Sequence, residues 1–183
     1  EKFNAIQSSV RTIMDENDNE ITHSDEILKI IKKFYSTLFE NKITNSREIN
    51  LTFLSELGLP TLSDSEKNIC EIEFTTDELL ETLQSMDGGK SPGNDGLGKE
   101  FYIHFWEIIK QPLFDSFMDA KQKGMLSPSQ RQSIIKLLAK KDRDKRYIDN
   151  WRPISLLNVD TKILSKTIAS RLKKVLPSLI KSD

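Results

Sequence analysis

The chain has 183 residues, of which 37% are hydrophobic and 30% charged, so it can bury the core of one folded domain and has no apolar run long enough to span a membrane. The single cysteine, Cys70, excludes an internal disulfide framework. One cysteine and two histidines in the whole chain are too few to build a zinc site. The charge is uneven, because residues 131–183 hold 14 Lys and Arg against 5 Asp and Glu, whereas residues 1–130 hold 13 against 23. A basic end of this kind can neutralise phosphates, or it can be only a solvated surface.

The N-terminal part of the chain predicts a turn followed by a helix. A polar run at residues 15–20 indicates a turn or the tip of a hairpin. Ser24 is placed to cap a helix over about residues 25–40. Apolar side chains recur there at helical spacing, namely Ile27, Leu28, Ile31, Phe34, Tyr35, Leu38 and Phe39.

Shorter helices are expected between residues 47 and 86. The first covers about residues 47–57 and ends at Gly58. Two capping boxes follow, Ser63 with Glu66 and Thr75 with Glu78. The second box opens a helix that continues to about residue 86 and buries Leu79, Leu80, Leu83 and Met86.

A glycine-rich segment, residues 87–96, separates these helices from a longer one. Its four glycines and one proline require turns. The apolar period then predicts a helix over about residues 99–123, kinked at Pro112 and terminated by Gly124.

The basic end predicts a β-hairpin and a final helix. Strands at residues 134–138 and 154–157 would pair antiparallel across a charged loop, residues 140–150. Asp160 is expected to cap a helix that runs to about Val175, with Arg171 in its C-terminal turn, where a cation suits the helix dipole. The predicted fold class is therefore α+β and mostly helical, with a short antiparallel β-hairpin.

Two segments of the chain could contact phosphate. In the glycine-rich segment, backbone N–H groups and Lys90 could hold an anion, although the spacing matches no P-loop and a plain structural turn is the alternative. The hairpin loop could fold over a nucleotide triphosphate, or its cations could pair with the aspartates of the same loop. The cations within or beside this loop are Lys140, Lys141, Arg143, Lys145, Arg146 and Arg152.

The hairpin loop also contains aromatic residues and a misleading motif. Tyr147 and Trp151 lie close enough to the cations in sequence to stack on bases. Tyr147-Ile148-Asp149-Asn150 is similar to the Tyr-x-Asp-Asp box of polymerases but has only one of its two carboxylates. Because two-metal catalysis needs closely spaced carboxylates, we interpret Asp149 as a loop residue.

Several segments, taken in order, resemble the reverse transcriptases of LINE-type (non-LTR) retrotransposons. The likeness spans residues 75–181, and a helix at residues 25–40 precedes it as in that family. The segments are Gly89–Leu97, Glu100–Tyr102 with Phe105 and Trp106, Gly124–Ser129, Ile135–Lys141, Asn150–Asp160, Lys162, Ile163, Ser165, Lys166, Ile168–Leu172 and Val175–Pro177. Ala139 and Asn94 depart from the family, which commonly has proline at both positions.

The resemblance implies a partial right-hand polymerase, with a helical arm or linker at residues 1–74 and an N-terminal extension plus fingers at residues 75–183. It implies that Lys140 and Arg152 contact the triphosphate of the incoming nucleotide. The glycine-rich loop lies in the extension that the family associates with template RNA, so Lys90, Ser91 and Gly93 are expected nucleic-acid contacts. Lys141, Arg143 and Arg146 are expected to contact nucleic acid as well.

The resemblance also implies what a longer parent protein would supply. The chain begins at Glu1 and ends at Asp183 before the family's catalytic aspartate blocks, so we expect it to have no catalytic residue or metal site and to be inactive alone. The expected partners of the parent are template RNA, a DNA primer, a deoxynucleoside triphosphate and Mg²⁺, together with the palm and thumb of the same polypeptide. We expect no membrane association and an intracellular location, nuclear or cytoplasmic.

Two other functions fit the same sequence. The chain could be a non-enzymatic nucleic-acid-binding module derived from a retroelement, or a helical interaction domain whose basic end only keeps it soluble. Nucleic-acid binding that weakens steeply with salt would separate these two possibilities.

Overall fold

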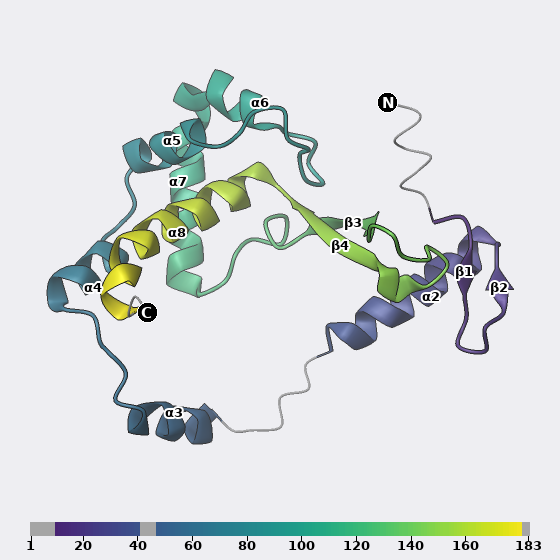
Figure 1. Ribbon diagram of the computed structural model, residues 1–183. Coiled ribbons are helices and arrows are strands. Elements are labelled where there is room, and N and C mark those ends of the chain that lie inside the picture. Colours follow the sequence, from purple (N-terminus) through teal and green to yellow (C-terminus); the bar gives the residue numbers. More distant parts are fainter. Residues whose placement is uncertain (1–9, 41–46, 181–183) are drawn as a thin grey trace. The chain divides into compact units, whose positions relative to one another are not determined.

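The computed structural model describes residues 10–40 and 47–180. The fold is mixed, about half helical, with two small antiparallel sheets of two strands each (Figure 1). It forms two compact units, one from Glu1–Thr52 and Ile135–Ser155 and the other from Phe53–Ile134 and Leu156–Asp183. The mixed helix and strand content with a short antiparallel hairpin is thus confirmed, with about half of the chain helical. The polymerase fingers fold and the division at residue 75 stay predictions.

The first unit opens with the predicted hairpin tip. β1 (Ile13–Met14) and β2 (Glu20–Ile21) pair antiparallel, with Ile13 opposite Ile21. The turn between them is held by one carboxylate, because Asp15 Oδ1 accepts the backbone N–H groups of Asn17 at 2.8 Å and Asn19 at 2.9 Å. The hydrogen bonds from Asn19, with a further one from Asn17, lower the pKa of Asp15.

Helix α2 (Ser24–Leu38) matches the predicted helix but begins one residue earlier than expected. Ser24 is not the N-cap. His23 has that position, with an extended backbone, and its carbonyl accepts the N–H groups of Glu26 and Ile27. Ile27 and Tyr35, which are two helical turns apart, are the buried residues of α2.

The second unit starts within α3 (Arg47–Glu56), which is followed by Gly58 with a left-handed φ of 56°. α4 (Asp64–Glu71) has the complete capping box of Ser63 and Glu66. α5 (Thr76–Gln84) has only half of the expected box. Thr75 accepts the Glu78 N–H at 3.1 Å, but the Glu78 carboxylate binds Arg171 instead of the N-cap backbone.

The expected long helix is divided in two. α6 (Lys99–His104) ends at Phe105, whose φ of −102° and ψ of 17° lie outside the helical range, and α7 (Trp106–Lys123) starts from the same residue. α7 continues through Pro112, and the kink expected at that proline stays a prediction. Gly124 ends α7 in the left-handed conformation, as predicted.

Helix α8 (Val159–Leu179) completes the second unit and packs against α4 and α5 (Figure 1). It begins earlier than predicted, because Asn158 and not Asp160 is the N-cap, and it ends later, so Arg171 does not lie in its last turn. The core of the unit is one apolar cluster drawn from α5, α6, α7 and α8: Leu79, Leu83, Tyr102, Trp106, Leu113, Phe117, Val159 and Ile163. No helix of the described residues is long and apolar enough to cross a membrane.

Candidate nucleic-acid interface

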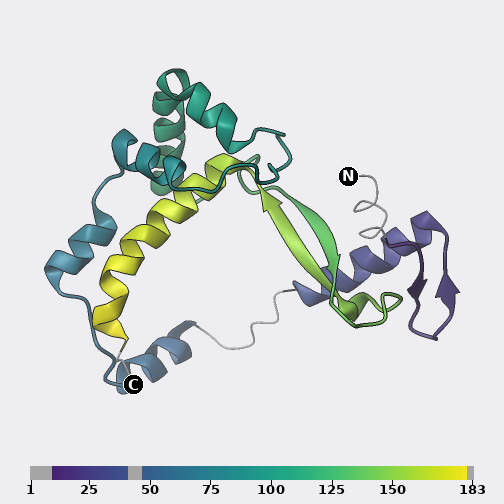
Figure 2. The same cartoon turned by 45° about the horizontal axis from the view of Figure 1, so that its top comes forward.

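The second sheet is the predicted hairpin, formed by β3 (Ser133–Ala139) and β4 (Trp151–Leu157), which run side by side in Figure 2. The Lys140 N–H donates to the Asn150 carbonyl at 2.8 Å. In an antiparallel ladder, this bond places Ala139 opposite Trp151 and Leu138 opposite Arg152. Lys140 and Arg152 therefore lie diagonally across the ladder on the same face of the hairpin.

The other face of the hairpin carries Trp151. Its side chain is 4% exposed, and its indole N–H donates to the Lys145 carbonyl at 2.8 Å. Because side chains alternate along a strand, burying Trp151 turns Arg152 outward. Trp151, a candidate for base stacking by its sequence position, is thus a structural residue of the hairpin, whereas Tyr147 is 41% exposed.

Backbone contacts order the charged loop between the strands. Asn150 Nδ2 donates to the Asp144 carbonyl at 2.9 Å, and Met14 N–H of β1 donates to the Arg146 carbonyl at 2.8 Å. Lys140 Nζ donates to the carbonyl of Asp149 at 2.6 Å. The bond from Met14 holds the loop against β1, and the other two bonds join residues of the loop to one another.

The loop cations differ in their partners. Arg146 forms an ion pair with Asp144 at 2.8 Å, and their hydrogen bonds raise the pKa of Arg146 and lower the pKa of Asp144. The side chains of Lys141, Arg143 and Arg152 are exposed and have no hydrogen bond or ion pair with any residue of the described ranges. Of these four cations, only Arg146 has the predicted ion pair with an aspartate of the loop.

Carboxylates near the loop do not form a metal site. Asp149 lies in η1, a turn of 3-10 helix at Ile148–Asn150. Within residues 10–40 and 47–180, no three His, Cys, Asp or Glu side chains are grouped so that they could hold a metal ion. Mg²⁺ stays a prediction for a longer parent protein.

A cavity of about 800 Å³ lies beside the loop within the first unit. Tyr147 and Ile148 contribute to its wall, with Phe34 of α2. Its charged lining residues are three acids and one base, namely Asp15, Glu16, Asp149 and Lys33. An acidic lining repels phosphate, so this cavity does not suit a triphosphate despite its size.

The glycine-rich loop is held against the start of α8 in the second unit. Gly93 is buried, and a Cβ there would lie 2.6 Å from the Leu157 carbonyl carbon and overlap Asn158 still more closely. Asn158 Oδ1 accepts the Asp95 N–H at 3.4 Å, and its Nδ2 donates to the Ser129 carbonyl at 3.2 Å. The glycine at position 93 therefore permits close packing of two backbones, and its proposed contact with nucleic acid stays a prediction.

The other two residues predicted in this loop lie beside lysines of the second unit. Lys90 is exposed and lies 3.7 Å from Asp87. The Ser91 carbonyl accepts a hydrogen bond from Lys162 Nζ at 3.1 Å. Lys162 and Lys166 of α8, with Lys99 of α6, share a small pocket with Lys90. We did not predict their clustering, because the three segments come together only through helix packing.

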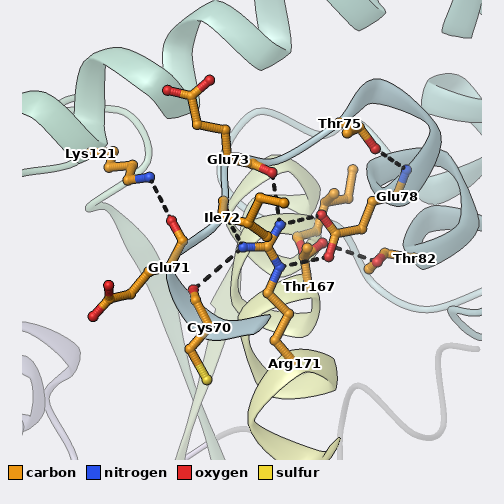
Figure 3. A network of polar contacts seen from close by, with 11 residues as sticks. Cys70, Glu71, Ile72, Glu73, Thr75, Glu78, Thr82, Lys121, Thr167 and Arg171 are labelled. Atoms are coloured by element: carbon orange, nitrogen blue, oxygen red, sulfur yellow. Dashed lines mark hydrogen bonds and ion pairs between the residues drawn. The ribbon is translucent and has the colours of Figure 1, made fainter. Parts of the chain in front are cut away.

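A buried arginine organises the opposite end of α5. Arg171 of α8 donates to Glu78 at 2.7 and 2.6 Å, and also to the carbonyls of Cys70, Ile72 and Glu73 (Figure 3). Its guanidinium also lies over the Phe74 ring at 4.6 Å. The bonds to Glu78 raise the pKa of Arg171. We expected Arg171 to lie in the last turn of its helix, and this was wrong because α8 continues to Leu179.

Comparison with known proteins gives one informative relative. No family model matches the chain. Over its whole length, with 185 residues aligned, the chain is 36% identical to the "Transposon TX1 uncharacterized 149 kDa protein" of Xenopus laevis. The alignment covers 100% of this chain but only 14% of that protein. The chain is thus homologous to one stretch of a much longer transposon protein.

Proposed function

We propose that the chain is the fingers-side part of a retrotransposon reverse transcriptase and contributes contacts to the template and to the incoming nucleotide. Two observations on the sequence support a retroelement origin. The ordered motifs resemble LINE-type reverse transcriptases, and the whole chain is similar to part of a transposon protein. The N-terminal extension and fingers, as polymerase modules, are part of this proposal.

The observation that carries the proposal is the arrangement of Lys140 and Arg152. They lie on one face of the hairpin beside its basic loop, and the exposed side chain of Arg152 makes no hydrogen bond or ion pair with the described residues. A guanidinium offers a planar fork for two phosphate oxygens, and an ammonium adds a point charge beside it. Such contacts strengthen as charge develops during phosphoryl transfer.

The remaining parts of the reaction belong to the longer protein in this proposal. The chain spans about a seventh of the relative that it matches, so palm, thumb, Mg²⁺ and primer binding are proposed for the parent. This chain alone is then expected to bind nucleic acid without extending a primer. Template-dependent extension by the purified 183-residue chain would contradict this division of roles.

The test is Arg152→Lys in the longer polymerase. The variant keeps the charge and loses the fork, so we expect the efficiency of nucleotide incorporation to fall by one to two orders of magnitude, roughly 1.4–3 kcal/mol of transition-state stabilisation. Template binding and melting temperature should be unchanged. Arg131→Lys is the matched control, because Arg131 is also exposed but lies in a turn outside the hairpin. A large loss of melting temperature with normal nucleotide dependence would assign Arg152 a structural role.

A second candidate function is a non-enzymatic nucleic-acid-binding module derived from a retroelement. The exposed cations of the hairpin loop, Lys141 and Arg143, favour it, because phosphate contacts need no catalytic group. The two functions differ in the longer protein. Incorporation activity that depends on Arg152 supports the polymerase, whereas nucleic-acid binding without any incorporation supports the module.

A further inference from the structure

A pocket of about 280 Å³ in the second unit is lined mainly by lysines. Its seven lining residues are Met86, Asp87, Lys90, Lys99, Val159, Lys162 and Lys166. Four lysines and one aspartate thus line one small space. From this geometry we propose that the pocket binds an internucleotide phosphate of a single-stranded nucleic acid, an inference that rests on the proposed contact between this chain and nucleic acid.

The lysines come from three segments and are anchored at their tips. Lys162 and Lys166 lie one turn apart on α8, and they donate to the carbonyls of Ser91 at 3.1 Å and Ser85 at 2.7 Å. Lys99, the first residue of α6, donates to the carbonyls of Gln84 at 3.0 Å and Met86. Because an ammonium has three protons, each of these lysines keeps at least one donor for a ligand.

Capping of α5 explains part of this arrangement. Lys99 and Lys166 bind carbonyls at the C-terminal end of α5, where cations interact favourably with the helix dipole. That role does not require Lys90 or Lys162, whose partners are Asp87 and the Ser91 carbonyl in the glycine-rich loop. The two additional cations raise the repulsion within the pocket, and an anion bound among the four would relieve it.

The pocket lining indicates which part of a nucleic acid would bind. It contains no aromatic ring to stack on a base and no amide side chain to read a base edge. Four ammonium groups recognise charge, and lysine binds phosphate as a point charge. The expected ligand is therefore the phosphodiester backbone, bound without regard to base sequence.

The experiment measures binding of the full chain to an end-labelled single-stranded RNA by fluorescence anisotropy at several salt concentrations. The test variant is Lys162→Gln/Lys166→Gln. The matched control is Lys110→Gln/Lys123→Gln, which removes two lysines of α7 that already pair with Glu107 and Asp119. We expect the test variant to bind roughly tenfold more weakly, with the slope of log affinity against log salt smaller by about 0.7, while the control changes less than about twofold.

A charge-keeping variant and a melting curve separate binding from folding. Lys162→Arg/Lys166→Arg should retain RNA affinity if the pocket needs charge. Equal losses in the test and control variants, or no loss in either, would overturn the proposal. A test variant that melts early and is not rescued by the arginine variant would show that these lysines only support the fold, which also overturns it.

Pyrophosphate distinguishes a failed pocket from a failed nucleic-acid function. Its binding is followed by the chemical shifts of backbone amides around the pocket. If the wild-type chain binds no RNA but pyrophosphate shifts these amides, and only the Lys162→Gln/Lys166→Gln variant loses the shifts, the site is a phosphate site and the nucleic-acid role fails. If pyrophosphate shifts nothing and the test variant binds RNA normally, the pocket assignment fails and the nucleic-acid role stands.

Discussion

Arg171 and Glu78, which are 93 residues apart in sequence, form a two-pronged ion pair with N–O distances of 2.7 and 2.6 Å. The Arg171 side chain is 6% exposed and that of Glu78 is 29% exposed. The same guanidinium donates to the Cys70 carbonyl in the last turn of α4 and to the Ile72 and Glu73 carbonyls in the segment between α4 and α5. One residue of α8 thus fixes both the start of α5 and the segment that leads into it.

Replacing Arg171 should destabilise the second unit strongly. Arg171→Met leaves Glu78 and three carbonyls without their donor, and we expect a loss of about 3 kcal/mol in the free energy of unfolding, measured by urea denaturation. Arg171→Lys should recover only part of this, because an ammonium cannot fork the carboxylate. Arg131→Met, at an exposed position, should change stability by no more than about 0.5 kcal/mol. A near-neutral Arg171→Met would show that the network contributes no net stability.

Gly93→Ala should also destabilise the chain, for a steric reason. The added Cβ would overlap the backbone of Leu157 and Asn158, so the glycine-rich loop must move away from α8. We expect a cost of about 1–3 kcal/mol or more, measured by thermal or urea denaturation. Gly89→Ala is the control, since Gly89 has open space around it and a φ of 65°, so only about 1–2 kcal/mol of backbone strain is expected.

A second variant tests whether the backbone is responsible. Asn158→Ala removes the side-chain oxygen that a Cβ on residue 93 would meet, but leaves the backbone nitrogen in place. Adding Asn158→Ala to Gly93→Ala should therefore rescue little. Full rescue would show that the side chain of Asn158 is the only obstacle.

The lowered pKa of Glu66 predicts that part of the chain's stability is lost in acid. Hydrogen bonds from the Ser63 hydroxyl, from Ser178 and from the Ser63 backbone lower the pKa of Glu66 to about 2, from an ordinary value of 4.5. Because the folded pKa lies below the unfolded one, this stabilisation is complete above about pH 4.5 and is lost as the pH falls through about 2. Melting temperature measured between these limits should depend less on pH in Glu66→Gln.

Ser63→Ala provides a check on the cause. It removes the hydroxyl that lowers the Glu66 pKa most, so its melting temperature should also become less dependent on pH in the same window. If Glu66→Gln and Ser63→Ala both keep the pH profile of the wild type, the capping box does not couple folding to protonation.

The hairpin loop predicts unequal contributions of its cations to nucleic-acid binding. Lys141→Gln/Arg143→Gln removes two exposed, unpaired cations of the described loop and should reduce the salt slope on single-stranded RNA by about 1.4, or roughly 0.7 for each phosphate that is no longer neutralised. Arg146→Gln should have a smaller effect, because Asp144 already neutralises Arg146. The measurement is anisotropy against salt concentration. Equal slopes in all variants would mean that the loop does not contact phosphate.

Local sequence signals located most helices, both strands of the hairpin and the glycines that end helices. These features depend on residues that are neighbours in the sequence. Gly124 and the Ser63 box are two examples in which composition and geometry agree. The break at Phe105 was missed, since no glycine or proline marks it and the apolar period continues across it. Pro112 lies inside α7, as expected, and the helix continues through it.

The candidate site was less predictable than the helices. Cations in the hairpin loop are neighbours in sequence, so their clustering could be predicted without a structure. Lys99 and Lys166 are 67 residues apart, and only the packing of α6 and α8 against α5 brings both to the C-terminal end of α5. Arg171 was expected in the last turn of its helix because the predicted end, at about Val175, came too early.

The alternation of faces in the hairpin limits how related chains can vary in length. Trp151 faces inward and Arg152 outward because successive side chains of a strand point to opposite faces. Inserting one residue between Trp151 and Arg152 would turn Arg152 to the inner face of the hairpin. Changes of one residue should therefore be found in the charged loop, while β3 and β4 keep their length or change by an even number.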